Sequence, residues 1–452
     1  MNKKFLLKLA IIGLLVLGLL IPLSMIEDLV SERSSFRQQA KDSIAQSWAG
    51  SQKVMGPVLV VPYSRQSVKK VWDKRLKDYV EERVREDYFH YVLPETLNIS
   101  GLIKTEERKR GIYAVPVYNL DLKIDGTFSA EKVKQNLKGS NLSVDWEQAH
   151  LLVTVADMRG VVQQPSLVWQ GQTREFISTN GLGGSGEGMK AYVPGLQLEN
   201  LDALDFNFAL DVQGMESVYF SPAAKNMQVD IEADWPHPSF VGRYLPAEHV
   251  IQDERFSAHW RVSSFSSGVD SALASCQSGD CGAFYRNLFG VELIQAVDIY
   301  LQAERSVKYA IMLITLTFTV FFLFEVMKSL RLHPMQYLLV GAALTVFYLL
   351  LVSLSEHIVF YQAYVIAACC SVTLVGVYMS AVLQSRLRAC GVSALLLLLY
   401  GLLYGILQSE DNSLLMGSLL IFGVLSLVMM VTRKLDWYYV SDQIAHQAVL
   451  KK

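Results

Sequence analysis

Six long apolar runs constrain this chain more than any other feature of its sequence. Backbone amides inside hydrocarbon must be hydrogen-bonded within the crossing segment, and about 20 helical residues are needed to cross about 30 Å. We therefore predict six membrane-spanning helices. The runs cover residues 5–25, 309–327, 335–354, 358–383, 391–408 and 414–432.

The first run has the basic start of a signal peptide, MNKK, but not its end. It closes in LIPLSMIED, which has no small-x-small pair for a peptidase to cut. We expect it to remain as an uncleaved N-terminal anchor.

The positive residues of the short connections predict the orientation, because Lys and Arg are retained on the cytoplasmic side. The connections 355–357 and 409–413 contain neither residue type. Both termini are therefore expected in the cytoplasm and residues 26–306 outside. The positive residues flanking the spans are Lys3, Lys4, Lys8, Lys328, Arg331, Arg386, Arg388, Arg433 and Lys434.

Four segments follow from this topology: an N-terminal anchor (1–25), a large periplasmic domain (26–306), a bundle of five transmembrane helices (307–434) and a cytoplasmic tail (435–452). The first helix is expected to continue to about Trp48, because no proline or interior glycine interrupts residues 26–48. After Gly50 the apolar pattern changes to a period of two.

Three stretches of the outer segment alternate between apolar and polar residues: NLDLKID (119–125), LDFNFALDV (204–212) and MQVDIEAD (227–234). Such alternation is typical of antiparallel strands with one face on a core and the other in water. The fold class predicted is a membrane protein of α plus β type whose β-rich periplasmic domain resembles a sandwich. The acidic outer faces are interpreted as solvated strand surface rather than a cation site.

Two cysteines of the outer segment, Cys276 and Cys281, flank a turn-forming Ser-Gly-Asp. They are a candidate disulfide, which an oxidising periplasm permits and which would contribute roughly 2 kcal/mol. Free thiols or half a metal site are the alternatives.

No motif of catalysis or cofactor binding is found. The eight histidines form no HExxH and no H-x3-H pair, and no G-x-S-x-G elbow is present. The glycine-rich stretch 181–194 lacks the lysine of a phosphate loop, so we expect a mobile loop or a hairpin tip there. We predict no enzyme, no cofactor and no metal, and a net charge of −2 gives no reason to expect nucleic acid.

A transporter or lipid-handling protein is the alternative function, because several spans could surround a path. Ionisable residues inside spans usually mark such a path, and here only Lys8 and Glu325 occur, both near a cytoplasmic end. The alternative predicts that substitutions on inner faces, at Gln362 or Tyr364, abolish function.

Two proline-containing stretches remain. In DWPHPSF, residues Trp235, Pro236, His237 and Pro238 form either a rigid recognition tip or a fixed corner of the sheet. In SLRLHPMQYLL, His333 and Pro334 are interpreted as the turn between two spans, with Pro334 in the first turn of the next helix.

Several segments together resemble the CreD inner-membrane protein family. They are GPVLVVPY (56–63), RGIYAVPVYNLDLKIDGTF (110–128), WPHPSFVGRYLP (235–246), KYAIMLITLTFTVFFLFE (308–325) and LRLHPMQYLLVGAALTVFYLLLVSLSEH (330–357). The likeness runs from residue 50 almost to LDWY at 435–438.

The resemblance implies a multi-pass protein of a Gram-negative inner membrane that contributes to cell envelope integrity. It also implies expression under the Cre two-component system and a link to the β-lactam stress response. It supplies no catalytic residue, and the roles of Trp235 to Pro238, His333 and Pro334 stay open. The partners expected are membrane lipids and a periplasmic or envelope protein; the oligomeric state is left open.

Overall fold

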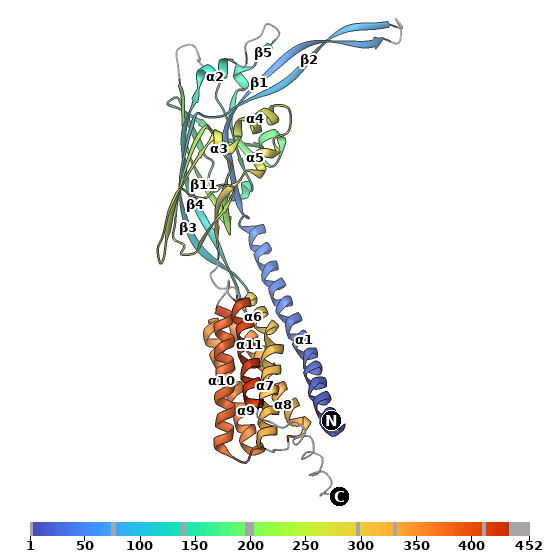
Figure 1. The fold of residues 1–452 in the computed structure, drawn as a ribbon. Helices are drawn as coiled ribbons and strands as arrows, with labels where there is room; N and C mark the ends of the chain where they lie inside the picture. Colours follow the sequence, from blue (N-terminus) through green and yellow to red (C-terminus); the bar gives the residue numbers. More distant parts are fainter. Residues whose placement is uncertain are drawn as a thin grey trace. The chain divides into compact units, whose positions relative to one another are not determined.

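The computed structural model describes residues 3–73, 78–135, 137, 142–194, 203–294, 299–328, 332–408 and 413–433. The chain divides into two compact units, one of Met1–Gln38 with Val297–Lys452 and the other of Gln39–Ala296. We call them the helical unit and the β-rich unit and describe each by itself (Figure 1).

Among its described residues, the helical unit contains the start of α1 (Lys3–Ser47) and six later helices. Five segments in the described part of the chain are long and apolar enough to cross a membrane: Leu6–Ser47, Ile299–Val326, Pro334–Ser355, Phe360–Val382 and Arg386–Gln408. The predicted N-terminal apolar helix and four later ones are therefore confirmed. The sixth predicted span is a helix whose apolar stretch, Leu415–Met430, is shorter. The later helices are α6 (Ile299–Lys308), α7 (Ala310–Lys328), α8 (Pro334–Ser355), α9 (Phe360–Val382), α10 (Arg386–Gln408) and α11 (Ser413–Thr432).

Helix α1 packs closely on the bundle. Leu19, Leu23 and Val30 of α1 are buried with residues of α7 and α8. At Gly341 of α8, a Cβ atom would lie 2.3 Å from Cδ1 of Leu19, so a larger residue would require the Leu19 side chain to shift. Small residues at such crossings allow close helix packing, which replaces the hydrophobic driving force that lipid does not supply.

Polar contacts hold α1 at two levels. Lys8 forms an ion pair with the buried Glu325 of α7, which also accepts hydrogen bonds from Leu332 N and Tyr337 Oη, each at 3.1 Å. Farther along α1, Nε of Arg33 lies 3.6 Å from Oε1 of Glu356 and forms a second ion pair. Twenty-five helical residues span about 37 Å, which exceeds the ~30 Å of hydrocarbon. Both ion pairs can therefore lie near membrane surfaces.

The Lys8–Glu325 pair yields a stability prediction. Glu325→Gln should leave the Lys8 ammonium without its counter-charge and lower the free energy of unfolding by about 1–3 kcal/mol. Adding Lys8→Met should recover part of that loss, as thermal unfolding of the full chain in detergent would measure. Strictly additive effects of the two substitutions would contradict the coupling.

The β-rich unit has seventeen strands among its described residues, in two sheets. In the nine-stranded sheet, seven strands follow one another in the order β14 (Pro238–Gly242), β17 (Phe289–Leu293), β12 (Ser217–Phe220), β1 (Gln52–Asp73), β6 (His150–Val155), β10 (Glu187–Tyr192) and β9 (Ile177–Asn180). The other two strands, β2 (Asp78–Val92) and β5 (Leu142–Val144), pair with β1. The eight-stranded sheet runs β15 (Glu248–Ile251), β16 (Phe256–Ser263), β13 (Asn226–Ala233), β3 (Thr96–Arg110), β4 (Tyr113–Ser129), β11 (Ala203–Met215), β7 (Ser166–Trp169), β8 (Gln172–Glu175).

The predicted alternation is confirmed in β4, β11 and β13. Strand β13 alternates exposed and buried residues over its whole length. One continuous core takes its buried side chains from both sheets, for example Leu59 and Val153 from the first and Phe206 and Ile231 from the second. The two sheets therefore pack face to face, and the predicted β-rich, sandwich-like architecture is confirmed.

Short helices cover part of the nine-stranded sheet. They are α3 (Ser264–Ser267), α4 (Val269–Gln277) and α5 (Gly282–Arg286), while α2 (Ala130–Gln135) follows β4. Val269 and Phe284 are buried there against Val58 of β1 and Leu152 of β6. The last turns of α1, which ends at Ser47 close to the predicted Trp48, bury Ile44 against Val115 and Met215.

Strands β1 and β2 continue far beyond the sheet. Strand β1 pairs with β12 at its start, then with β6, and with β5 as far as Arg65. From Gln66 on, it pairs only with β2 among the described residues. This two-stranded extension, residues 66–73 and 78–85, is called the arm (Figure 1).

Candidate functional site

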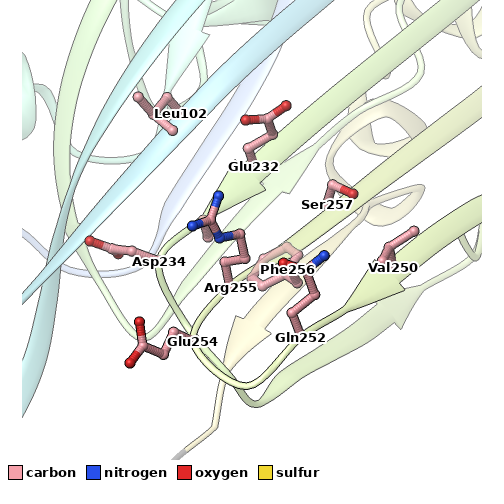
Figure 2. Close-up of a pocket in the computed structure, with 10 residues that line it drawn as sticks. Leu102, Glu232, Asp234, Val250, Gln252, Glu254, Arg255, Phe256 and Ser257 are labelled. Atoms are coloured by element: carbon pink, nitrogen blue, oxygen red, sulfur yellow. The ribbon is translucent and has the colours of Figure 1, made fainter.

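A groove of about 380 Å³ lies on the β-rich unit where β3, β13, β15 and β16 meet (Figure 2). Its lining mixes carboxylates, one guanidinium and apolar side chains. The residues are Leu102, Glu232, Ala233, Asp234, Val250, Gln252, Glu254, Arg255, Phe256 and Ser257.

One carboxylate of the groove, that of Asp234, is held by the neighbouring strand. The described lining of the groove contains no histidine, cysteine or lysine. Asp234 accepts hydrogen bonds from the amide and hydroxyl of Thr105 at 2.7 and 2.8 Å, which ties its carboxylate to β3. Ser257 lies opposite Glu232 in the β13–β16 pairing, and the described lining brings no histidine or lysine to its hydroxyl.

Strand β15 forms one side of the groove and is an edge strand. All four of its residues are exposed, with Val250 55% and Ile251 49% accessible. It pairs only with β16 in the described part of the sheet. An unpaired edge with exposed apolar side chains is a template for adding another strand.

An Asp-His pair lies on the same sheet but is not arranged for catalysis. Nδ1 of His259 contacts Asp230, and Nε2 accepts a hydrogen bond from Arg261 Nε at 2.8 Å. Arg261 also lies 3.4 Å from Glu248. Because both ring nitrogens are occupied, His259 has no nitrogen left to serve as a general base.

No group of three or more His, Cys, Asp or Glu residues that could hold a metal ion occurs among the described residues. His249 lies ten residues before His259, and the centroid of its ring is 5.2 Å from that of Phe240. The acidic outer strand faces carry Asp–Asn, Asp–Lys and Asp–His contacts, for example Asn98 with Asp125 at 2.9 Å.

The stretch Trp235–Pro238 connects β13 of one sheet to β14 of the other. Trp235 Nε1 donates to Ile294 O at 3.0 Å, and the amide of Ile294 donates to His237 O at 3.2 Å. His237 itself is exposed. These contacts are those of a corner fixed between the two sheets, and they bring no catalytic group to the imidazole of His237.

His333 and Pro334 form the N-terminus of α8. His333 Nδ1 accepts from Met335 N at 3.3 Å, while Gln336 Oε1 accepts from His333 N at 3.0 Å, which completes a reciprocal capping box. Pro334 occupies the first turn, where an amide proton would lack a helical partner. Lys328 and Arg331, predicted to hold this turn inside, lie outside the described side chains.

Cys276 of α4 and Cys281, the N-cap residue of α5, are joined by a disulfide and are buried. Of the glycine-rich stretch 181–194, residues 181–186 form the tip of the β9–β10 hairpin and pack against these cysteines, while residues 187–192 form β10 itself. Leu182 of this tip is buried, and Tyr285 Oη donates to Leu182 O at 3.0 Å and to Ser185 O at 2.6 Å. The expected hairpin tip is thus observed.

Gly183 gives a test of this packing. Its φ is +68°, and an added Cβ atom would lie 2.7 Å from Sγ of Cys281; Gly184 has φ +76° with nothing within 4 Å. Gly184→Ala should cost only backbone strain, about 1–2 kcal/mol. Gly183→Ala should cost measurably more in thermal unfolding of the full chain. Equal destabilisation by the two would show that the hairpin tip does not rest on the disulfide.

Two buried histidines make the β-rich unit sensitive to pH. Burial lowers the pKa of His90 below its ordinary value of 6.5 and, together with the nearby Lys190, that of His150. Nδ1 of His150 lies 2.8 Å from Gln148 O, whereas Nε2 of His90 is buried and has no partner. Both rings are therefore neutral in the folded unit near pH 7.

A stability profile follows from these lowered pKa values. These histidines bind protons more readily in the unfolded chain than in the folded one. Their contribution to the free energy of unfolding is therefore fully present above pH 6.5 and is lost as the pH falls toward their lowered pKa values in the folded chain. His90→Asn should flatten this fall between neutral pH and pH 5, whereas the exposed His237→Asn should leave it unchanged. Thermal melts of the full chain across pH would measure both; parallel profiles for all three proteins would contradict the assignment.

A cluster of hydroxyls lies inside the helical unit. Tyr364 Oη donates to Tyr400 O at 2.7 Å, and Ser371 Oγ lies 2.9 Å from Tyr400 Oη. The buried hydroxyl of Tyr348 has no hydrogen-bond partner. Tyr364 therefore lies on an inner face of its helix, as predicted. The same prediction for Gln362 is wrong, because the side chain of Gln362 is exposed.

Sequence reasoning missed the groove. Its lining comes from β3 and from β13 with the β15–β16 hairpin, and β3 precedes the others by more than a hundred residues. The one signal available was the acidic face of MQVDIEAD, whose Glu232 and Asp234 line it. Alternation alone assigns these carboxylates to solvent and cannot show which strands meet beside them.

The apolar helices and the large sandwich define a class of protein: a multi-pass membrane protein carrying a β-rich domain. The family model described as "Inner membrane protein CreD" matches residues 4–438. The inner membrane protein CreD of Escherichia coli (strain K12) is 36% identical over 425 residues, which are 94% of this chain and 91% of that protein. The chain belongs to the CreD family and is an inner-membrane protein.

Among solved structures, an M1 zinc metallopeptidase mutant from Deinococcus radiodurans bound to a Tyr-Ser-Ala substrate shows slight similarity. The TM-score is 0.20 at 8% identity, over 38% of this chain and 39% of that one. So low a score bears on neither fold nor activity.

Proposed function

We propose that this protein contributes to cell envelope integrity under envelope or β-lactam stress, through a non-enzymatic binding or structural role of its β-rich unit. The unit is placed on the periplasmic side, with both termini cytoplasmic. The positive residues of the short connections and the expected family role support this placement.

The groove beside the open edge of β15 carries the proposal. It offers a strand edge, exposed apolar side chains at Val250 and Ile251, and the charges of Glu232 and Arg255. Backbone pairing along such an edge supplies affinity, and the side-chain pockets beside it supply specificity. This arrangement suits an extended segment of an envelope protein.

Photo-crosslinking in intact cells tests the binding role. A photoreactive amino acid in place of Val250 should yield a defined adduct with an envelope protein, and the adduct should increase under β-lactam treatment. The matched control is Val162, which is 53% exposed on the same unit away from the groove. Identical adducts from both positions, or none from Val250, would argue against the groove.

A deletion strain tests the process. Loss of the gene should lower survival in detergent and in β-lactam relative to the parent strain. The wild-type gene should restore survival. Unchanged survival under every such stress would contradict the envelope role.

Transport or lipid handling by the helical unit is the second candidate, favoured by the Tyr348, Tyr364 and Tyr400 cluster. In this case Tyr348→Phe with Tyr364→Phe, which removes two buried hydroxyls and keeps the rings, should fail to restore survival. If the binding role is correct, that variant should restore it as well as the wild type does.

A further inference from the structure

The arm is an exposed two-stranded ribbon that the groove does not explain. It contains eight residues of β1 beyond the last contact with β5, which corresponds to about 27 Å of extended chain. Two-stranded ribbons outside a larger sheet are only marginally stable in water. The side chains that such a ribbon displays are therefore informative about its surroundings.

One face of the arm is fully exposed and has a distinct composition. Residues paired across antiparallel strands point to the same face, and every second residue shares it. All of the side chains on this face are exposed. They are Gln66, Val68, Lys70 and Trp72 of β1, and Tyr79, Glu81, Arg83 and Arg85 of β2.

Aromatic and apolar side chains gather at the outer end of this face. Trp72 is 50% exposed, Tyr79 63% and Val68 58%. Trp72 and Tyr79 lie opposite each other in the β1–β2 pairing, and the centroids of their rings are 5.1 Å apart. Trp and Tyr are the residues that favour the boundary between water and hydrocarbon, because each combines an apolar ring with a polar tip.

The charges behind the rings are mostly positive. Lys70, Arg83 and Arg85 are opposed on this face by Glu81 alone. Arg85 also contacts Asp87 at 3.1 Å, but both side chains are more than 70% exposed and the pair is weak. Cations near an anionic bilayer surface are attracted to its headgroups. The face is therefore complementary to a negatively charged lipid surface.

A flat sugar polymer fits this face less well. Stacking on consecutive sugars requires ring faces that share a plane, whereas the planes of Trp72 and Tyr79 are inclined at 71°. Their T-shaped arrangement forms a wedge, which suits insertion between lipid headgroups.

We infer that the outer end of the arm is a docking surface for an anionic phospholipid bilayer, with Trp72 and Tyr79 inserted at the interface and Lys70 and Arg83 on the headgroups. This inference does not depend on the groove or on the proposed envelope role. It gives the β-rich unit a lipid contact separate from the spanning helices.

Vesicle flotation with the full chain tests it. The protein is reconstituted in nanodiscs of phosphatidylcholine and mixed with vesicles of phosphatidylcholine with or without phosphatidylglycerol. Protein-loaded discs should float with the anionic vesicles, and high salt should reduce recovery because it screens the attraction. Empty discs give the background.

Trp72→Ser with Tyr79→Ser should reduce recovery by about tenfold. Tyr88→Ser is the matched control, because Tyr88 is 40% exposed on the opposite face of the same hairpin and should leave recovery unchanged. Lys70→Glu with Arg83→Glu keeps both rings and should abolish the preference for phosphatidylglycerol. Thermal unfolding verifies that each variant is folded.

Equal recovery of wild type and the folded serine variant on anionic vesicles would overturn the inference. Equal recovery of wild type on neutral and anionic vesicles would overturn it as well. Binding of the discs to purified peptidoglycan without any flotation would assign the face to a glycan partner and likewise reject the lipid surface.

Discussion

The backbone pairing of strand β1 is the interaction on which the β-rich unit depends. This one strand pairs in parallel with β12, and antiparallel with β6, β5 and β2, so it connects distant parts of the chain within one sheet. Its Leu59 and Val61 enter the common core, while Val58 and Val60 face α4 and α5. Because alternate side chains of β1 serve two different apolar clusters, a shift of one residue in register would exchange both sets.

A different constraint shapes the helical unit. Hydrocarbon offers no hydrogen-bond partners, so its backbone must be helical and its polar side chains must find partners within the protein. Glu325, Tyr364 and Tyr400 satisfy this requirement through contacts with other helices, whereas the buried hydroxyl of Tyr348 has no partner among the described residues. The family motif at Leu332–Tyr337 belongs to the cluster around Glu325, which gives it a structural role that a turn alone would not require.

Sequence reasoning was strong where local chemistry decides the outcome. Apolar run length predicted the helices, a period of two predicted β4, β11 and β13, and the absence of breakers predicted the extent of α1. Contacts between distant residues were not accessible in this way. The partner of Glu325 is Lys8, 317 residues away, and the groove combines β3 with the β15–β16 hairpin. The arm was missed because its alternating charges and aromatics have no core to face, so their pattern carries no burial signal.

Placement of the β-rich unit on the periplasmic side underlies the proposed envelope role, and cysteine labelling tests it most directly. In a chain with Cys369, Cys370 and Cys390 replaced by Ala, a membrane-impermeant maleimide is applied to spheroplasts. Phe265→Cys, at a position 99% exposed in the β-rich unit, should be labelled before lysis. Arg433→Cys, exposed after the last apolar helix, should be labelled only after lysis. The reverse pattern would place the β-rich unit in the cytoplasm and contradict the proposed role.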